Sequence, residues 1–121
     1  MPLPAETIST AEAAASAIDA KKGQGISLLD VSRLIVITDV FLIASGTSRR
    51  HVLSLAEGVE ERLKEIDRRP LRREGVEDAT WVLLDYGELV VHVFDQPTRE
   101  YYALERLWSD APRLTVPVSA T

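Results

Sequence analysis

Cysteine is absent from this chain of 121 residues. A chain without thiols can form neither a disulfide framework nor a thiolate zinc site, and it has no cysteine nucleophile. Glycine and proline are also few, at six residues each, which excludes a fibrous or low-complexity chain. The remaining composition, 45% hydrophobic and 27% charged, is that of one soluble globular domain.

Long apolar runs and targeting signals are missing too. The apolar segments have the length of strands, well short of the roughly twenty residues that a membrane-spanning helix requires. The first residues, Met1 to Glu6, lack the basic and apolar pattern of a signal peptide and the Arg-rich pattern of a transit peptide. We therefore expect a cytoplasmic protein without membrane contact.

Acidic residues outnumber basic ones. Nineteen Asp and Glu against fourteen Lys and Arg give a formal net charge of -5, which disfavours extensive phosphate binding and favours a basic partner. The one basic cluster is Arg68, Arg69, Arg72 and Arg73. We expect it to be a solvated strand edge, with Arg72 and Arg73 as candidates for an RNA contact once another contact has brought them near.

Hydrophobic periodicity predicts three helices and about five strands. Helices are expected at about 7–22, 48–66 and 98–108, and strands at 26–31, 35–45 and 71–74 and in a hairpin over 81–94. The order α-β-β-α-β-β-β-α indicates an α/β (α+β) fold with a mixed sheet and helices packed mainly on one face. Residues 1–112 are expected to form a single domain, and residues 113–121 a flexible C-terminal tail.

The predicted hairpin, WVLLDYGELVVHVF, has two different faces. With a turn centred on Tyr86 and Gly87, Trp81 lies opposite His92. The face expected to be buried under the helices is aliphatic: Val82, Leu84, Leu89, Val91 and Val93. The other face mixes aromatic, aliphatic, acidic and histidine side chains: Trp81, Leu83, Asp85, Glu88, Val90, His92 and Phe94.

Two interpretations of this mixed face remain open. Its composition is that of a binding patch, with an aromatic anchor and a polar rim. Alternatively, a helix or loop covers it, so that Trp81 and Phe94 belong to the core and His92 makes a structural hydrogen bond.

Acids and histidines raise the question of catalysis. Asp85, Glu88 and His92 could form an acid–base set, but acids at a hairpin tip are most often turn formers and a lone histidine is more often structural. His51 could bind an anion with the Gly46-Thr47-Ser48 backbone, although an ordinary helix start explains that stretch equally well. We predict no catalytic residue, no metal ligand and no cofactor, because no common enzyme signature is present.

The order of strand, Gly46-Thr47 and helix resembles the opening of the nucleotidyltransferase fold. In active members of that superfamily an Asp-x-Asp pair on the next strand binds metal, whereas residues 71–74 of this chain read LRRE. An alternative function is therefore a metal-dependent nucleotidyltransferase with a displaced site built from Asp39, Asp85 and Glu88.

Three ordered motifs carry a resemblance to a known family. The stretches ITDVFLIASGTSRRHV at 37–52, WVLLDYGELVVHVF at 81–94 and REYYALERLW at 99–108 resemble the ribosomal silencing factor family, also called RsfS or Iojap. The turn departs from the more common Asp-Tyr-Gly-Asp by carrying Glu88. Asp95-Gln96 replaces a stretch that often begins with His.

The resemblance implies a nucleotidyltransferase-like domain that is not an enzyme. It implies binding to protein number fourteen of the large ribosomal subunit, so that joining of the small subunit is sterically blocked and translation is repressed. It also implies help in late large-subunit biogenesis in some relatives, and a homodimer when free. A plain homodimeric assembly module that does not bind the ribosome is a further alternative.

Partner contacts in the family map to Trp81, Leu83 and the Asp85-Tyr86 turn of this chain. Together with the other outward residues of the hairpin, they make up the predicted partner-binding set: Trp81, Leu83, Asp85, Tyr86, Glu88, Val90 and His92.

Overall fold

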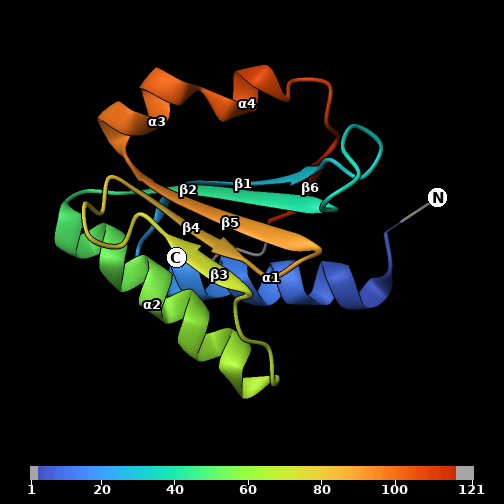
Figure 1. Cartoon of the computed structure of the whole chain (residues 1–121), viewed down its shortest axis with the longest axis horizontal. Coiled ribbons are helices and arrows are strands. Elements are labelled where there is room, and N and C mark those ends of the chain that lie inside the picture. Colours follow the sequence, from blue (N-terminus) through green and yellow to red (C-terminus); the bar gives the residue numbers. More distant parts are fainter. Residues whose placement is uncertain (1–2, 117–121) are drawn as a thin grey trace.

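The computed structural model of the chain describes residues 3–116 and places helices on both faces of one mixed sheet. The elements in chain order are α1 (Ala5–Ala20), β1 (Gln24–Asp30), β2 (Val40–Gly46), α2 (Arg49–Glu65), β3 (Arg72–Glu74), β4 (Trp81–Asp85), β5 (Leu89–Asp95), α3 (Gln96–Tyr102), α4 (Leu104–Leu107) and β6 (Arg113–Leu114). Figure 1 shows α1 and α2 below the sheet and α3 and α4 above it. No helix within residues 3–116 has the length and apolar character that crossing a bilayer requires.

The strand order is β3-β4-β5-β2-β1-β6, with β2 parallel to β5 and the other neighbours antiparallel. Every residue of the central strand β2 is buried, as expected of a strand covered on both faces. The predicted α+β fold with a mixed sheet and helices packed mainly on one face is confirmed, since the two long helices share one face and only the short α3 and α4 lie on the other within the described residues (Figure 1). The described residues form six strands instead of about five, because Arg113 and Leu114 pair with β1 where the tail was expected to begin. Residues 117–121 of that expected tail lie outside the described residues.

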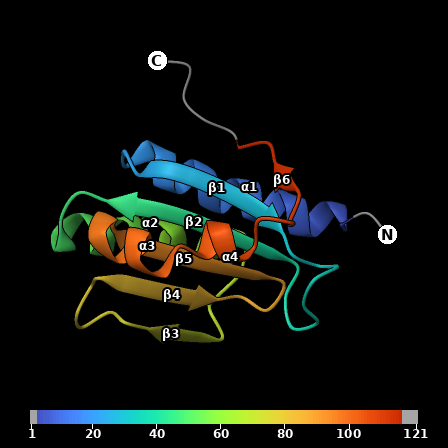
Figure 2. The same cartoon turned by 90° about the horizontal axis from the view of Figure 1, so that it is seen from above.

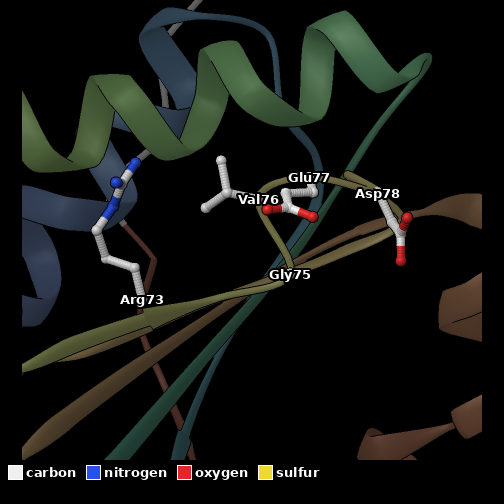
Figure 3. A pocket seen from close by; sticks show the side chains of 5 residues that line it. All are labelled: Arg73, Gly75, Val76, Glu77 and Asp78. Carbon is white, nitrogen blue, oxygen red and sulfur yellow. The ribbon is translucent and has the colours of Figure 1, made fainter.

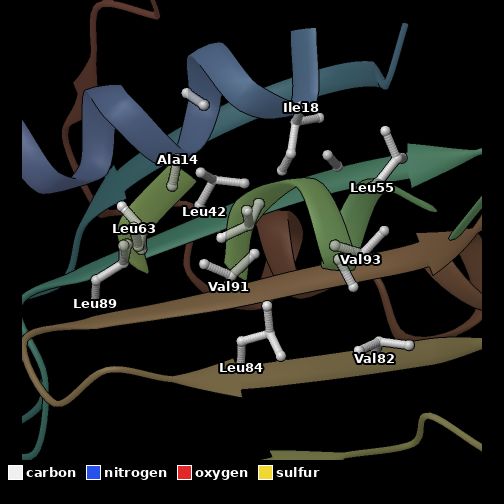
Figure 4. Packing of buried hydrophobic residues seen from close by; sticks show 14 of the residues in the cluster. Ala14, Ile18, Leu42, Leu55, Leu63, Val82, Leu84, Leu89, Val91 and Val93 are labelled. Carbon is white, nitrogen blue, oxygen red and sulfur yellow. The ribbon is translucent and has the colours of Figure 1, made fainter. Parts of the chain in front are cut away.

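The face below the sheet is closed by aliphatic packing. α2 begins where the sequence predicts, because Ser48 Oγ accepts a hydrogen bond from the His51 backbone N–H at 3.0 Å. Apolar residues at steps of three and four then face the sheet: Val52, Leu55, Ala56, Val59 and Leu63. The aliphatic hairpin residues predicted to be buried pack in the same core (Figure 4), each 0% exposed: Val82, Leu84, Leu89, Val91 and Val93.

The second strand is shorter than predicted. It begins at Val40, not at residue 35, and Val36 and Ile37 in the preceding loop are 101% and 87% exposed. Leu34 and Ile35 donate their backbone N–H groups to Val31 O, which forms a local turn instead of a strand ladder. Apolar β-branched residues alone therefore do not mark a strand in this segment.

The last predicted helix is divided in two. Asp95 caps α3 by accepting a hydrogen bond from the Thr98 backbone N–H at 2.9 Å, and Pro97 lies in its first turn as expected. Ala103 then adopts a left-handed conformation with φ 46°, which ends α3 and redirects the chain into α4. This break separates the two short helices that lie over the upper face.

A polar network fastens α3 and α4 to the sheet. Arg99 donates to Glu105 Oε1 through Nε at 3.0 Å and through Nη2 at 2.8 Å, and its Nη1 donates to Ser45 Oγ at 2.9 Å. Ser27 donates to Glu105 Oε2 at 2.7 Å, and Arg113 Nη1 lies 3.6 Å from the same oxygen. Burial opposes ionisation of Glu105, but the hydrogen bonds from Ser27 and Arg99 and the charges of Arg99 and Arg113 outweigh it and lower its pKa.

Candidate partner-binding face

The hairpin predicted over residues 81–94 is present, but its pairing differs from the expected one. Trp81 lies opposite Phe94, whereas the sequence predicts Trp81 opposite His92. The difference is two residues along β5. Because side chains alternate with a period of two, the assignment of residues to the two faces is confirmed although their cross-strand partners are not.

The position of the turn explains the different pairing. Gly87 adopts φ 90°, a conformation that glycine reaches without steric cost. Tyr86 N–H donates to Leu89 O at 2.8 Å, and Gly87 N–H donates to Asp85 Oδ1 at 2.8 Å. The two turn residues are therefore Gly87 and Glu88, one position later than the pair predicted from sequence.

The two short helices leave part of the upper face uncovered. Figure 2 shows α3 and α4 over β5 and β2, with β4 and β3 extending beyond them. The surface here called the open face comprises the half-buried residues of β4, Val90 of β5 and the two β3 residues that pair beside β4 on the same side: Trp81, Leu83, Asp85, Val90, Arg72 and Glu74. Apolar and charged side chains thus lie together on one side of the sheet.

Two residues of the predicted partner-binding set are not accessible. Tyr86 is 3% exposed, because the later turn lets the β4 alternation continue and carries its ring into the core below the sheet. His92 is 5% exposed, because Trp81 and the Phe41 ring lie against it. The expectation that their side chains reach a partner is therefore corrected, whereas Glu88 remains half-buried at the turn.

His92 positions the tryptophan ring. Trp81 Nε1–H donates to His92 Nδ1 at 3.1 Å, and since indole nitrogen is only a donor, the proton of the neutral imidazole lies on Nε2. Nε2 has no hydrogen-bond partner within the described chain. Burial lowers the pKa of His92 to about 4, so the ring is neutral at physiological pH. This matches the structural alternative considered for His92.

Trp81 lies between two shallow depressions. One, of about 340 Å³, is lined by Thr80, Trp81, Pro97, Thr98, Tyr101 and Tyr102. The other, of about 230 Å³, is lined by Glu74, Gly75, Trp81 and Leu83. The Trp81 ring stacks on Phe94 at 4.9 Å between centroids and also contacts Tyr102 at 4.6 Å. Its position is therefore set by aromatic neighbours while one part stays accessible.

The tyrosines beside Trp81 are absent from the predicted set. Tyr101 is 82% exposed and Tyr102 is 49% exposed, and both lie within the helix predicted at about 98–108. Their adjacency was the available signal, because successive residues on a helix point about 100° apart and cannot both face the sheet.

The predicted acids are paired with the arginine cluster. Asp85 Oδ2 accepts from Arg72 Nε at 3.2 Å, and Glu88 forms an ion pair with Arg68. Arg73 instead points to the helix side and pairs with Glu60 of α2 at 3.0 Å. The two arginines predicted as RNA contacts therefore lie on opposite faces of the sheet.

A wider depression of about 420 Å³ lies at the loop between β3 and β4, lined by Arg73, Gly75, Val76, Glu77 and Asp78. In Figure 3 the Arg73 side chain points to α2, whereas Asp78 points away from that helix. Arg49 donates to the backbone oxygens of Glu77 and Asp78 at 3.0 and 2.8 Å. The polar groups here hold the loop and do not converge on a common point.

Within residues 3–116, no three His, Asp or Glu side chains form a group that could hold a metal ion. Asp39, Asp85 and Glu88 therefore do not assemble the displaced metal site of the nucleotidyltransferase alternative.

His51 serves the helix start. Its Nδ1 accepts the Thr47 backbone N–H at 2.9 Å, and its Nε2 lies 2.8 Å from Lys21 O. With both ring nitrogens engaged, His51 links the ends of α1 and α2, as the structural interpretation of this stretch requires.

Fold and surface together define a class: a small α+β protein that presents a sheet face with an aromatic anchor and charged neighbours. Residues 4–121 match the family described as ribosomal silencing factor during starvation. The ribosomal silencing factor RsfS of Bacillus subtilis (strain 168) is 40% identical over 99 residues, covering 82% of this chain and 84% of the relative. The chain belongs to the ribosomal silencing factor (RsfS) family.

Two further comparisons agree with this assignment. A crystal structure of a protein from Chromobacterium violaceum matches with a TM-score of 0.83 and 35% identity, covering 95% of each chain. The mouse protein named mitochondrial assembly of ribosomal large subunit protein 1 is 32% identical over 92 residues, which are 74% of this chain and 40% of that protein.

Proposed function

We propose that this protein binds the large ribosomal subunit through the open face, with protein number fourteen of that subunit as its partner. By occupying that protein it would sterically prevent the small subunit from joining, and so repress translation without catalysing a reaction. Cytoplasmic ribosomes would be its target. The names of the relatives in the silencing factor family support a ribosomal role.

The observation that carries this proposal is the accessible part of Trp81. A half-buried aromatic ring flanked by Leu83, with Asp85 at the edge of the same face, has the make-up of an interface anchor and its polar rim. The acidic net charge of -5 favours association with a basic protein. Of the two arginines considered for RNA contact, Arg72 belongs to the open face, and we retain only it as a candidate.

The decisive test is sucrose-gradient sedimentation with purified ribosomal subunits. Trp81→Ala is expected to abolish cosedimentation with large subunits and to restore subunit joining, because it removes the anchor. Ile66→Ala is the matched control: Ile66 is an exposed apolar residue, 49% exposed, at the end of α2. It is expected to bind like the wild type.

Circular dichroism and thermal unfolding of each variant distinguish the loss of a binding contact from the loss of the fold. If Trp81→Ala does not fold, Leu83→Glu on the same face replaces it, because this half-buried position admits a charge at lower cost. A folded variant that binds like the wild type would refute the proposed surface. Self-association of the wild type without ribosome binding would favour the homodimeric assembly module.

The mouse relative's name favours a second role, in assembly of the large subunit. We propose that the same contact forms on late large-subunit precursors. Deletion of the gene should then increase particles that sediment just below mature large subunits, and complementation with Trp81→Ala should fail to correct the profile. An unchanged profile after deletion would remove this role.

A further inference from the structure

The carboxylates of the open face already form ion pairs with an arginine of this chain. Arg72 lies between two of them, with Nε 3.2 Å from Asp85 Oδ2 and Nη1 3.0 Å from Glu74 Oε2. At the adjacent turn, Arg68 Nη2 lies 2.5 Å from Glu88 Oε1. A basic partner that approaches this face therefore meets acids that already have internal counter-ions.

The two arginine pairs differ in how firmly they are held. Arg68 and Glu88 side chains are each 26% exposed, and Arg68 also donates to Tyr86 O at 3.1 Å, so this pair braces the turn. Arg72 is 64% exposed and has Glu74, 55% exposed, as a second partner. Arg72 can leave Asp85 and still keep a carboxylate beside it, whereas Arg68 cannot leave Glu88 without loosening the turn.

The Asp85 carboxylate is held in place by a second hydrogen bond, which does not involve Arg72. Its Oδ1 accepts the Gly87 backbone N–H at 2.8 Å, which fixes the carboxylate independently of Arg72. Its side chain is 22% exposed, and the other oxygen, Oδ2, accepts the hydrogen bond from Arg72 Nε. Removal of Arg72 would leave this oxygen oriented next to Leu83 on the same strand.

We infer that Arg72 is a displaceable internal counter-ion, and that the partner binds Asp85 by taking the place of Arg72, which then pairs with Glu74 alone. This inference rests on the proposed function. Exposed ion pairs contribute little free energy, so the exchange is nearly balanced and proceeds only when the apolar contact at Trp81 and Leu83 holds a basic side chain in place. Arg72 thereby discriminates against basic proteins that lack a matching apolar surface.

The test is the Kd of the isolated large-subunit protein number fourteen, without RNA, for purified variants of this chain. Arg72→Gln is expected to bind about twofold to fivefold more tightly at low salt, because the internal competitor is gone. The gain is expected to shrink as salt is added. Arg73→Gln is the matched control: it removes the neighbouring arginine, which pairs with Glu60 on the other face, and is expected to leave the Kd unchanged.

Two further variants test the exchange itself. Glu74→Gln is expected to weaken binding by a similar factor, because the displaced Arg72 loses its second partner. Asp85→Asn keeps an acceptor for Gly87 N–H and is expected to cancel the gain of Arg72→Gln in the double variant.

Failure of the inference and failure of the proposed function give different results. Weaker or unchanged binding by Arg72→Gln would overturn the inference alone, and weaker binding would make Arg72 a direct contact. No binding by the wild type, or wild-type binding by folded Trp81→Ala, would remove the proposed function and the inference with it.

Discussion

The two faces of this sheet are built from the same strands but by different chemistry. Below the sheet, two helices of 16 and 17 residues close an aliphatic core. Above it, within the described chain, neither α3 nor α4 has a fully buried residue. Aromatic rings, a neutral histidine and the Arg99–Glu105 network hold that side, together with the buried aliphatic residues Leu29, Val31 and Ile43. Both faces bury apolar side chains, and the upper face in addition leaves Trp81 and its neighbours partly accessible.

The largest expected effect is a loss of stability, and it is tested by comparing two neighbouring residues of β4, Leu84 and Leu83. Leu84 is 0% exposed below the sheet, so Leu84→Ala should lower the free energy of unfolding by about 2–5 kcal/mol. Leu83→Ala, on the open face, should lower it by about 1 kcal/mol. Urea denaturation followed by circular dichroism measures both. Equal losses would mean that the two faces do not differ in their contribution to stability.

A smaller effect is the pH dependence of stability that comes from His92, on the upper side of the sheet. The unfolded chain binds a proton on His92 below its ordinary pKa of 6.5, whereas burial lowers the folded-state pKa to about 4. Between these values the unfolded state holds more protons, so stability should fall as pH drops from 6.5 to 4 and this contribution should level off below 4. The loss attributable to His92 is on the order of 3 kcal/mol.

His92→Gln isolates this contribution. Urea midpoints of the wild type and the variant are measured across the same pH range, and their difference cancels the other titrating groups. Glu105 is one of these groups, since its lowered pKa makes its own contribution disappear only as pH falls through the acidic range. A pH-independent difference between the two proteins would contradict the buried neutral histidine.

The smallest expected effect concerns a polar atom in the aliphatic core. Tyr86 Oη is buried and has no hydrogen-bond partner among residues 3–116, and burial, followed by the charge of Glu60, raises the pKa of this hydroxyl to about 12. Tyr86→Phe should therefore change the free energy of unfolding by no more than about 1 kcal/mol, and an increase is expected because the variant no longer buries an unpaired hydroxyl. The urea midpoint checks this, and a clear loss would reveal a hydrogen bond made by the hydroxyl.

Sequence periodicity predicted the fold and the two faces of the hairpin because both depend on alternation and helical spacing. It did not locate the turn, since Tyr86-Gly87 and Gly87-Glu88 are both acceptable two-residue turns, and the structure selects the second by pairing Tyr86 with Leu89. Tyr86 belongs to the predicted binding set because the resemblance maps the family's contacts to the Asp85-Tyr86 turn, whereas its ring lies in the core.

The ion pairs of the open face were beyond sequence reasoning for a different reason. Arg72 meets Asp85 only through the register of β3 against β4, and no local pattern sets the register of strands joined by a loop. The division of the last helix likewise depends on Ala103, whose left-handed backbone has no sequence signal, because alanine favours helix continuation.

The shortness of β3 has a consequence for solubility. This outer strand has three residues, all charged and exposed, and Pro70 lies two positions before it. A strand of another molecule would find few free backbone groups there and would meet charge instead of apolar side chains. Edge-to-edge addition that leads to aggregates is thereby discouraged at this side.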